Sequence, residues 1–477
     1  MMTSDPQLIK NILIKDIKSF GHLMPPYIPE PDHPVYRHVL DIADDDNNQR
    51  MRAVFRTLFT DKKLRLMAKK IDKTLIRLTN ALDNELFGQS SASASVSVVD
   101  IKQMFINQSI DLIGNVMFSL KQQYNTFNDN PNPNNTNYNK ITQLIKRLFI
   151  RSKYHILAQL VLPKFMLRVL NMTSLISADD LNKFTDLTVS ELTKRLNIKT
   201  ISTDTYDDFL QWLLNRCPEF MDKSVDKPVD KSVDKSVDNE TDETLSSLSD
   251  MSKTMSKQEV VANMFSLFSA SYDSYYLTMT FIIYELAINP DCQQRVYDEI
   301  ITCFRDNNTD SQSTTIDGQL FDWETLGKLE YLEACISETL RLHSILNREV
   351  RIARHDYTDE TTGVTIKKDQ MIQFSRSAVQ LCPDYYRMPD QFIPDRFLKQ
   401  NKHQLIDSTY LPFGLGRRMC PAYKFAPMAL KLNTAHLLAR YRFLPIDGQT
   451  VFKTDPIFEH YAYCPEKLVL KIEKRKV

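Results

Sequence analysis

A short stretch near the C-terminus surrounds one cysteine with residues that a purely structural cysteine does not need. Residues 411–427 read LPFGLGRRMCPAYKFAP, so two glycines and two arginines precede Cys420 and a proline follows it directly. Glycine lets a backbone turn closely, and arginine brings positive charge near a thiol. The sequence therefore marks Cys420 as a candidate functional residue, and its role depends on what the rest of the chain places around it.

Two further motifs precede this cysteine. Residues 331–343 read YLEACISETLRLH, in which Glu338 and Arg341 are three positions apart and share one face of an expected helix. A Glu-x-x-Arg pair alone is a weak signal, because surface helices contain many such pairs. Arg396, in the segment FIPDRF, lies 24 residues before Cys420 and is placed to complete an Arg–Glu–Arg network.

A long helix is the main element expected to position these groups. Residues 256–288 contain no proline or glycine, and Pro290 disfavours helical geometry at Asn289, so we predict that the helix stops there. It is apolar on most faces and should be buried over roughly 45–50 Å. Asp273 and Ser274 lie in its middle, and a buried carboxylate beside a hydroxyl is costly without a purpose. Either the two residues act together in chemistry, or a helix-bending hydroxyl lies beside a paired acid.

In this order and spacing the motifs resemble those of the cytochrome P-450 family, closest to its microsomal xenobiotic- and lipid-metabolising members. The family's loop Phe-x-x-Gly-x-Arg-x-Cys-x-Gly is matched at Phe413, Gly416, Arg418 and Cys420, with Ala422 at the last glycine position. SETLRL carries the family's Glu-x-x-Arg, PDRF matches Pro-Glu-Arg-Phe with an acid-for-acid exchange, and ASYDSY falls where the family has Ala-Gly-x-Asp/Glu-Thr-Thr. The resemblance runs from about Asp5 to the C-terminus.

The resemblance implies a fold and a cofactor. We expect a mainly α cytochrome P-450 fold with a long central helix and a small β region, binding haem b through the thiolate of Cys420. Phe413 would cover the sulfur, and Gly416 would let the loop turn close to it. The remaining roles implied by the family are propionate binding by Arg418, Arg351 and Arg52, proton relay by Asp273 and Ser274, and a purely structural network of Glu338, Arg341 and Arg396.

The resemblance also implies an activity and partners. We expect insertion of one oxygen atom of O2 into a lipophilic small molecule, with NADPH-derived electrons from a diflavin reductase and with cytochrome b5 as a further donor. The reductase would dock where Arg417, Lys424 and Lys431 offer positive charge. The chain would act as a monomer on the cytosolic face of the endoplasmic reticulum. Two alternatives are a haem-binding protein without turnover and a haem-thiolate isomerase or dehydratase; the Asp273–Ser274 pair disfavours the second.

Four departures from the family pattern bear on these expectations. Ser274 replaces the usual threonine and lacks the methyl group that restricts rotation. Ser271 stands at a glycine position, which keeps the non-catalytic alternative open, and Asn48 stands where the family has a propionate-binding tryptophan, four residues before Arg52. Residue 1 aligns near the family's B helix, so we expect the membrane anchor and the first strands of the small sheet to be missing. That predicts an open strand edge around Val364–Phe374.

Composition sets the outer bounds. The chain has 477 residues, 42% of them hydrophobic, which is enough for a large core, and it carries 60 basic and 60 acidic residues. This balance argues against a nucleic-acid partner bound through global charge. The seven cysteines are scattered, odd in number and form no CxxC pair, which favours free thiols in a reducing compartment over a disulfide framework or a zinc site.

Two segments interrupt an otherwise single domain over residues 1–477. Residues 125–139 are rich in asparagine and proline and predict a surface loop. Residues 222–238 repeat a four-residue Asp-Lys-Ser/Pro-Val unit, and we predict a disordered insertion over 222–251, because its apolar content is too low to offset the entropy of ordering. No apolar run reaches the roughly 18–20 residues of a membrane-spanning helix. Residues 157–172 fit either a helix at a membrane surface or a core-facing helix pair broken at Pro163.

Overall fold

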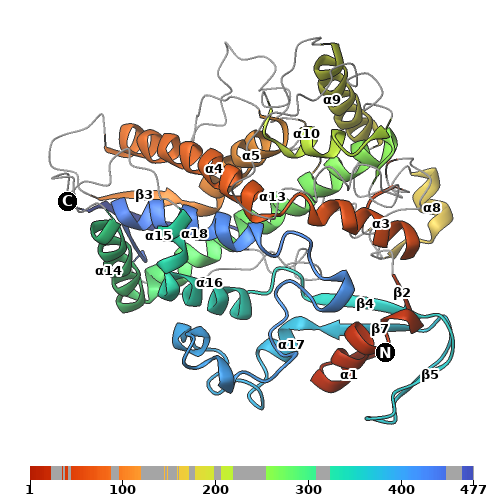
Figure 1. The fold of residues 1–477 in the computed structure, drawn as a ribbon. Coiled ribbons are helices and arrows are strands. Elements are labelled where there is room, and N and C mark those ends of the chain that lie inside the picture. Colours follow the sequence, from red (N-terminus) through yellow and green to blue (C-terminus); the bar gives the residue numbers. More distant parts are fainter. Residues whose placement is uncertain are drawn as a thin grey trace, which may run out of the picture.

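The structure of the chain is a computed structural model, and helices dominate it (Figure 1). The expectation of a mainly α fold with a small β region is therefore confirmed. The expected surface loop over 125–139 and the insertion over 222–251 lie outside the described residues. The described residues are 1–22, 35, 38–40, 45–87, 96–119, 144, 148, 158, 161–170, 178–197, 206–218, 254–307, 323–446 and 465–475.

The central helix is α13, Lys257–Ile288. Ser256 caps its N-terminus in a capping box with Glu259, in which each side chain binds the other residue's backbone N–H. The helix ends at Asn289, directly before the proline that begins α14, Pro290–Asn307. The predicted helix over 256–288 is therefore confirmed, and both its ends follow from local sequence signals. It crosses the middle of the molecule in Figure 1.

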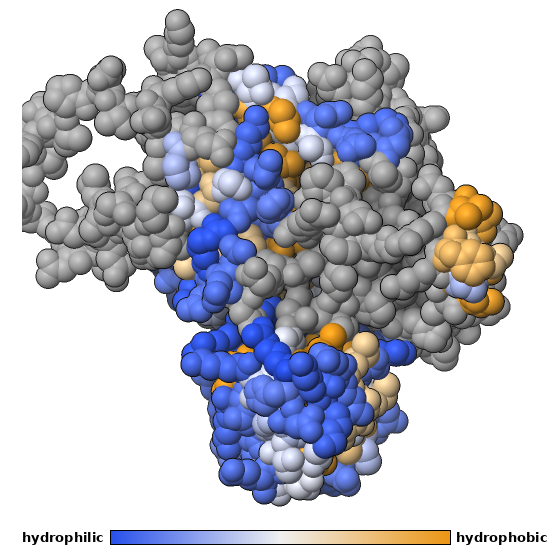
Figure 2. Space-filling model, turned by 90° about the vertical axis from the view of Figure 1, so that its right-hand side faces the viewer, coloured by the Kyte–Doolittle hydropathy of each residue, from blue (hydrophilic) through white to orange (hydrophobic). Residues whose placement is uncertain are grey.

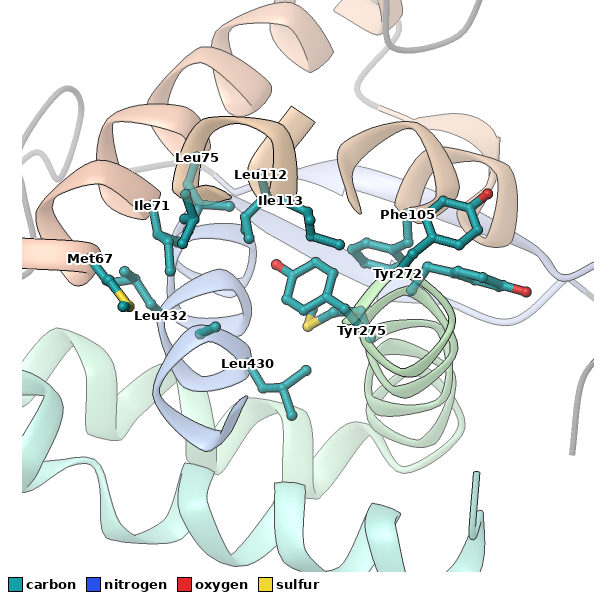
Figure 3. Packing of buried hydrophobic residues seen from close by; sticks show 14 of the residues in the cluster. Met67, Ile71, Leu75, Phe105, Leu112, Ile113, Tyr272, Tyr275, Leu430 and Leu432 are labelled. Atoms are coloured by element: carbon teal, nitrogen blue, oxygen red, sulfur yellow. The ribbon is translucent and has the colours of Figure 1, made fainter. Parts of the chain in front are cut away.

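Helices surround α13 and bury its side chains. The close neighbours include α5 (Ile101–Phe118), α16 (Glu330–Leu342) and α18 (Phe425–Arg440), and α4 (Asp61–Leu82) packs against α5 and α18. Figure 3 shows Tyr275 of α13 directed between α5 and α18. Its hydroxyl accepts a hydrogen bond of 2.7 Å from the Asn433 side chain, which also donates to Gln108 at 2.9 Å. The Asn433 amide group thus links α5, α13 and α18 through hydrogen bonds inside the core.

The structure describes further helices, several of which contribute side chains to the same core. They are α1 (Pro6–Lys10), α3 (Asp45–Arg56), α8 (Lys164–Val169), α9 (Ala178–Asn197), α10 (Phe209–Leu214), α15 (Trp323–Lys328) and α17 (Arg376–Gln380). Short 3₁₀ or π turns include η1 (Asn11–Lys15), η2 (Ile17–Ser19), η3 (Asp83–Phe87), η6 (Pro394–Phe397), η7 (Lys402–Gln404) and η8 (Gly416–Arg418).

Three small sheets complete the described part of the chain. One has the strand order β1 (Met2–Thr3), β7 (Met371–Ser375), β4 (Arg348–Ala353) and β2 (Phe20–His22). A second has the order β3 (Val96–Asp100), β9 (Val469–Lys474) and β8 (Tyr441–Leu444), and the third pairs β5 (Tyr357–Thr358) with β6 (Thr365–Ile366).

The open strand edge expected around Val364–Phe374 is not found at β7. β7 pairs antiparallel with β4 on one side and parallel with β1 on the other, where Met2 lies opposite Gln373 and Thr3 opposite Phe374. β6 is paired with β5. For β7 the expectation was wrong, because the first residues of the chain themselves supply the neighbouring strand; β6 belongs to a two-stranded sheet and is paired on one side only. The outer strands of the four-stranded sheet have two and three residues, and such short edges limit unwanted strand pairing.

The N-terminal segment is anchored by its own hydrophobic cluster. Leu8, Ile9, Ile12 and Leu13 of α1 and η1 are almost completely buried. They pack with apolar residues of the four-stranded sheet and with Leu411, just before the cysteine loop. Each such side chain contributes about 1.5–3 kcal/mol when fully buried. This cluster fixes η1 against the segment that carries Cys420.

Candidate functional site

The loop that carries Cys420 closes on itself before α18. The backbone N–H of Cys420 donates a hydrogen bond of 2.7 Å to the carbonyl oxygen of Phe413. Between them η8 makes one 3₁₀ turn, and Gly414 and Gly416 both adopt left-handed backbone angles, with φ of 72° and 71°. Phe413 packs against the main core, whereas Cys420 is partly exposed. The loop therefore holds the thiol at a fixed place with one side accessible.

Gly416 has a second reason to be glycine that the sequence did not show. A Cβ built on it would lie 3.0 Å from the carbonyl carbon of Leu13 and would collide with the carbonyl oxygen. Both contacts are with backbone atoms of η1, which cannot move aside as a flexible side chain does. The sequence motif predicted a close turn at Gly416, but not its contact with the N-terminal segment.

Arg52 reaches the cysteine loop from α3. Its Nη1 donates to the carbonyl oxygen of Met419 at 2.7 Å, one residue before the cysteine. Its Nε donates to the side-chain oxygen of Asn48 at 3.0 Å, four residues earlier on the same helix. Asn48 is buried and in turn donates to the carbonyl oxygen of Leu40 at 2.6 Å. Asn48, at the family's tryptophan position, therefore orients Arg52.

Arg351 lies in a buried ionic cluster that sequence reasoning missed. Alternation along β4 places Glu349 and Arg351 on the same face of the strand, and both are buried. One carboxylate oxygen of Glu349 accepts from Arg351 at 2.5 Å, and the other accepts from Arg376 of α17 at 2.9 Å. Burial raises the pKa of Glu349, but the two guanidinium groups outweigh this effect, so that pKa lies below its usual value. We call these three residues the arginine–carboxylate cluster.

The middle of α13 carries the expected acid and alcohol. The Ser274 hydroxyl donates to the carbonyl oxygen of Ala270 at 2.5 Å, and the Ser271 hydroxyl donates to that of Leu267 at 2.6 Å. Asp273 and Ser274 are partly exposed, and Ala270 is exposed, although α13 is buried on either side of this segment. Ala270, Ser271, Asp273 and Ser274 are therefore accessible on one side of the helix, while Tyr272 between them is buried.

The three residues of the expected structural network meet in the interior. Arg341 binds Glu338 through two hydrogen bonds of 2.7 and 2.8 Å, and both side chains are completely buried. Arg396 Nε donates to the same carboxylate at 3.2 Å. The remaining donors of Arg341 bind backbone carbonyls of the segment that precedes η6, at Pro389 and Gln391 among others. The network thus joins α16 to that segment, and every ionic group in it is paired.

The positive surface expected near the cysteine loop is smaller than predicted. Arg417 is exposed, and Lys424 is half-exposed with its Nζ 3.8 Å from a carboxylate oxygen of Asp61. Lys431 is buried in α18 and donates to the Leu326 carbonyl oxygen at 3.1 Å and to Glu333 at 2.8 Å. The expectation that Lys431 adds charge to a docking surface was wrong, because its helical position faces the core.

Comparison with known proteins agrees with the sequence motifs around Cys420. The sequence profile of the family described as Cytochrome P-450 matches residues 1–469. The chain belongs to the cytochrome P-450 family. It is 26% identical to Cytochrome P-450 3A6 of Oryctolagus cuniculus over 100% of this chain and 83% of that protein. It is 26% identical to Cytochrome P-450 3A7 of Homo sapiens, over 99% and 82%. It is 24% identical to Probable cytochrome P-450 6a14 of Drosophila melanogaster, over 93% and 78%.

Membership makes this chain a cytochrome P-450 monooxygenase and implies a haem with a cysteine thiolate ligand. The residues present fit that group. Cys420 offers a soft sulfur ligand in a closed loop, which suits haem iron. The buried Nε–H groups of Arg351 and Arg376 meet no acceptor among the described residues, and guanidinium groups match the two carboxylates of a haem.

Proposed function

We propose that Cys420 is the axial ligand of haem b and that this P-450 inserts one oxygen atom of O2 into a lipophilic small molecule with electrons from NADPH. A thiolate-ligated haem supplies the chemistry, because the thiolate donates electron density to the iron and favours O–O cleavage. The chain's own residues hold the cofactor, exclude water and handle protons.

The setting of Cys420 carries this proposal. Its loop is closed by the hydrogen bond to Phe413, and arginines from separate elements approach it: Arg52 at Met419, and the arginine–carboxylate cluster at Gly414. A structural cysteine needs none of these groups. A carboxylate-bearing cofactor that is ligated by sulfur needs both the thiol and the arginines, and Arg418 lies in the same loop as a further propionate ligand.

Proton delivery is assigned to Asp273 and Ser274. The Ser274 hydroxyl donates a hydrogen bond to the Ala270 carbonyl oxygen, so its oxygen lone pairs remain available to accept a hydrogen bond from protonated Asp273 or from water. Both side chains are partly exposed in the middle of α13. A proton can then pass through Oγ of Ser274 as the hydroxyl rotates. Ser271, at the family's glycine position, turns its hydroxyl back to Leu267 and Phe268 of its own helix.

Two surface features support a proposal for the electron donors and for the location. We assign the docking of a diflavin reductase, and of cytochrome b5 as a second donor, to the face with Arg417 and Lys424 near the cysteine loop. None of the helices that the structure describes combines the length and apolar character needed to span a bilayer. Figure 2 shows a compact apolar patch at its right-hand edge, which corresponds to α8. We propose that this patch holds the protein on the endoplasmic reticulum membrane.

Reconstitution separates this proposal from its alternatives. The haem-loaded protein is incubated with a diflavin reductase, NADPH and a panel of lipophilic compounds, and oxygenated product is measured with isotopically labelled O2. The proposal predicts product that carries one labelled atom and depends on the reductase. Product formed without reductase or O2 would indicate an isomerase or dehydratase. No product and no NADPH consumption with any compound would indicate a haem-binding protein without turnover.

A further inference from the structure

The arginine–carboxylate cluster has a geometry that an isolated ion pair would not have. Two arginines share the Glu349 carboxylate: Arg351 donates a hydrogen bond to one of its oxygens, and Arg376 donates to the other. A single arginine beside a carboxylate commonly takes both oxygens in a fork of two parallel hydrogen bonds. Sharing prevents that fork, and it leaves the buried Nε–H of each arginine without an acceptor among the described residues. Donors therefore remain in the cluster for another anion.

The charge of the cluster also requires explanation. All three side chains are largely buried, with about one-tenth or less of each exposed. One carboxylate and two guanidinium groups carry a net charge of +1 in the interior. Burying charge is costly unless the charges are compensated, so an excess cation favours binding of a further anionic group. Without Arg376 the pair of Glu349 and Arg351 would be neutral and would offer little attraction to an anion.

The cluster lies directly against the cysteine loop. A Cβ built on Gly414 would lie 3.3 Å from one carboxylate oxygen of Glu349 and 3.4 Å from Nη2 of Arg376. The backbone N–H of Arg376 donates to the carbonyl oxygen of Asn347 at 3.0 Å, which fixes the start of α17 beside β4. Arg376 is therefore held in place by both its backbone hydrogen bond and its ion pair, next to the loop that carries Cys420.

We infer that Arg376 is a positioning residue for haem: by occupying one oxygen of Glu349, it leaves Arg351 with donors and positive charge for a propionate. This inference rests on the proposed haem-thiolate function. In the cluster Glu349 competes with the propionate for Arg351, and Arg376 limits that competition. Removing Arg376 should then lower the amount of haem retained, whereas removing the charge of Glu349 should raise it.

Haem transfer to excess apomyoglobin measures the retention directly. Arg376→Leu should lose haem at least about tenfold faster than the unmodified protein, because Glu349 can then close a fork on Arg351. The double variant Glu349→Leu with Arg376→Leu should return close to the unmodified rate. Arg348→Gln is the matched control, since it removes one positive charge from the exposed face of the same strand, and its rate should change by less than about twofold.

Glu349→Gln decides the question if Arg376→Leu does not fold. It should slow haem loss, yet lower the thermal midpoint of the haem-free protein, because two like charges then face each other without their carboxylate. A merely structural role would weaken both properties. Faster haem loss in Glu349→Gln, or equal rates in Arg376→Leu and Arg348→Gln, would overturn the inference. Failure of the haem-thiolate assignment is seen separately, as loss of the thiolate-type carbon-monoxide band in the unmodified protein.

Discussion

At the scale of single residues, the position of Cys420 depends on backbone atoms that take no part in chemistry. Gly416 has a left-handed φ and lies against the carbonyl group of Leu13. Gly363 has a similar φ of 69° but has nothing near its Cβ position. The two glycines therefore differ in crowding and not in backbone conformation, which makes them a matched pair for mutation.

Gly416→Ala should both destabilise the protein and speed haem loss, whereas Gly363→Ala should cost only the strain of a left-handed residue, about 1–2 kcal/mol. Thermal unfolding and haem transfer to apomyoglobin measure the two effects. The reason is that the added methyl group would push η1 and the cysteine loop apart. If both alanine variants lose stability equally and retain haem, the contact with Leu13 has no importance for the site.

Ser274 is the residue through which proton delivery can be tested. Ser274→Ala should leave NADPH consumption in place but divert it to peroxide, because the hydroxyl that accepts and passes on the proton is gone. Ser274→Thr should raise the product formed per NADPH, because the added methyl group restricts the χ1 torsion and holds the oxygen in one position, while the O–H bond can still turn. Peroxide, product and NADPH are measured in the same reaction. Unchanged coupling in both variants would assign proton delivery to water chains instead.

The sequence predicted the cysteine loop but missed the partners of Arg351. Phe413, Gly416 and Cys420 lie within eight residues, so their spacing alone defines the loop. Glu349 and Arg376 are 27 positions apart and meet only because β4 and β7 pair with a particular register and α17 follows directly. In the sequence, the cluster is indicated by the two-residue spacing of Glu349 and Arg351, which places both on the same face of a strand.

At the scale of elements, the buried network of Glu338, Arg341 and Arg396 connects α16 to the chain before η6. Breaking a buried ion pair by removing one partner leaves an uncompensated charge, so Glu338→Ala should lower the free energy of unfolding by about 3–5 kcal/mol in urea denaturation. Glu330, on the same helix, forms an ion pair with Lys399 at the surface. Glu330→Ala should leave the free energy of unfolding essentially unchanged. If both variants lowered the free energy of unfolding by a similar small amount, the network would have no structural role.

The elements differ in how well the sequence predicts them. The limits of α13 follow from a capping serine and a terminating proline, both of which are local. The burial of Lys431 could not be predicted in this way, because it depends on which face of α18 meets α15 and α16. The pairing of β1 with β7 joins residues about 370 positions apart, and a pattern of two residues cannot specify such a partner.

At the scale of the whole molecule, α8 and its flanks expose apolar side chains on one side. Val161, Phe165, Val169 and Leu170 are each more than half exposed, and Met166 is 39% exposed. Val98 of β3 is exposed to a similar degree, at 58%, and β3 lies at the opposite end of the molecule in Figure 1. The two places provide a test and a control for membrane attachment.

Changing Phe165 and Val169 together to aspartate should weaken sedimentation with phosphatidylcholine vesicles at least about tenfold, since each side chain loses the free energy of apolar burial. Val98→Asp should leave vesicle binding as it is. Equal binding by the α8 variant and the unmodified protein, or equal losses at both places, would contradict membrane attachment through α8.

The central claim is that Cys420 provides the thiolate ligand of a haem, and the reduced carbon-monoxide difference spectrum tests it most directly. The unmodified protein should show the red-shifted band of a thiolate-ligated haem. Cys420→His should still bind haem but lack that band, whereas serine at any other cysteine should leave it intact: Cys217, Cys292, Cys303, Cys335, Cys382 or Cys464. A red-shifted band that persists in Cys420→His would place the ligand elsewhere and contradict the account.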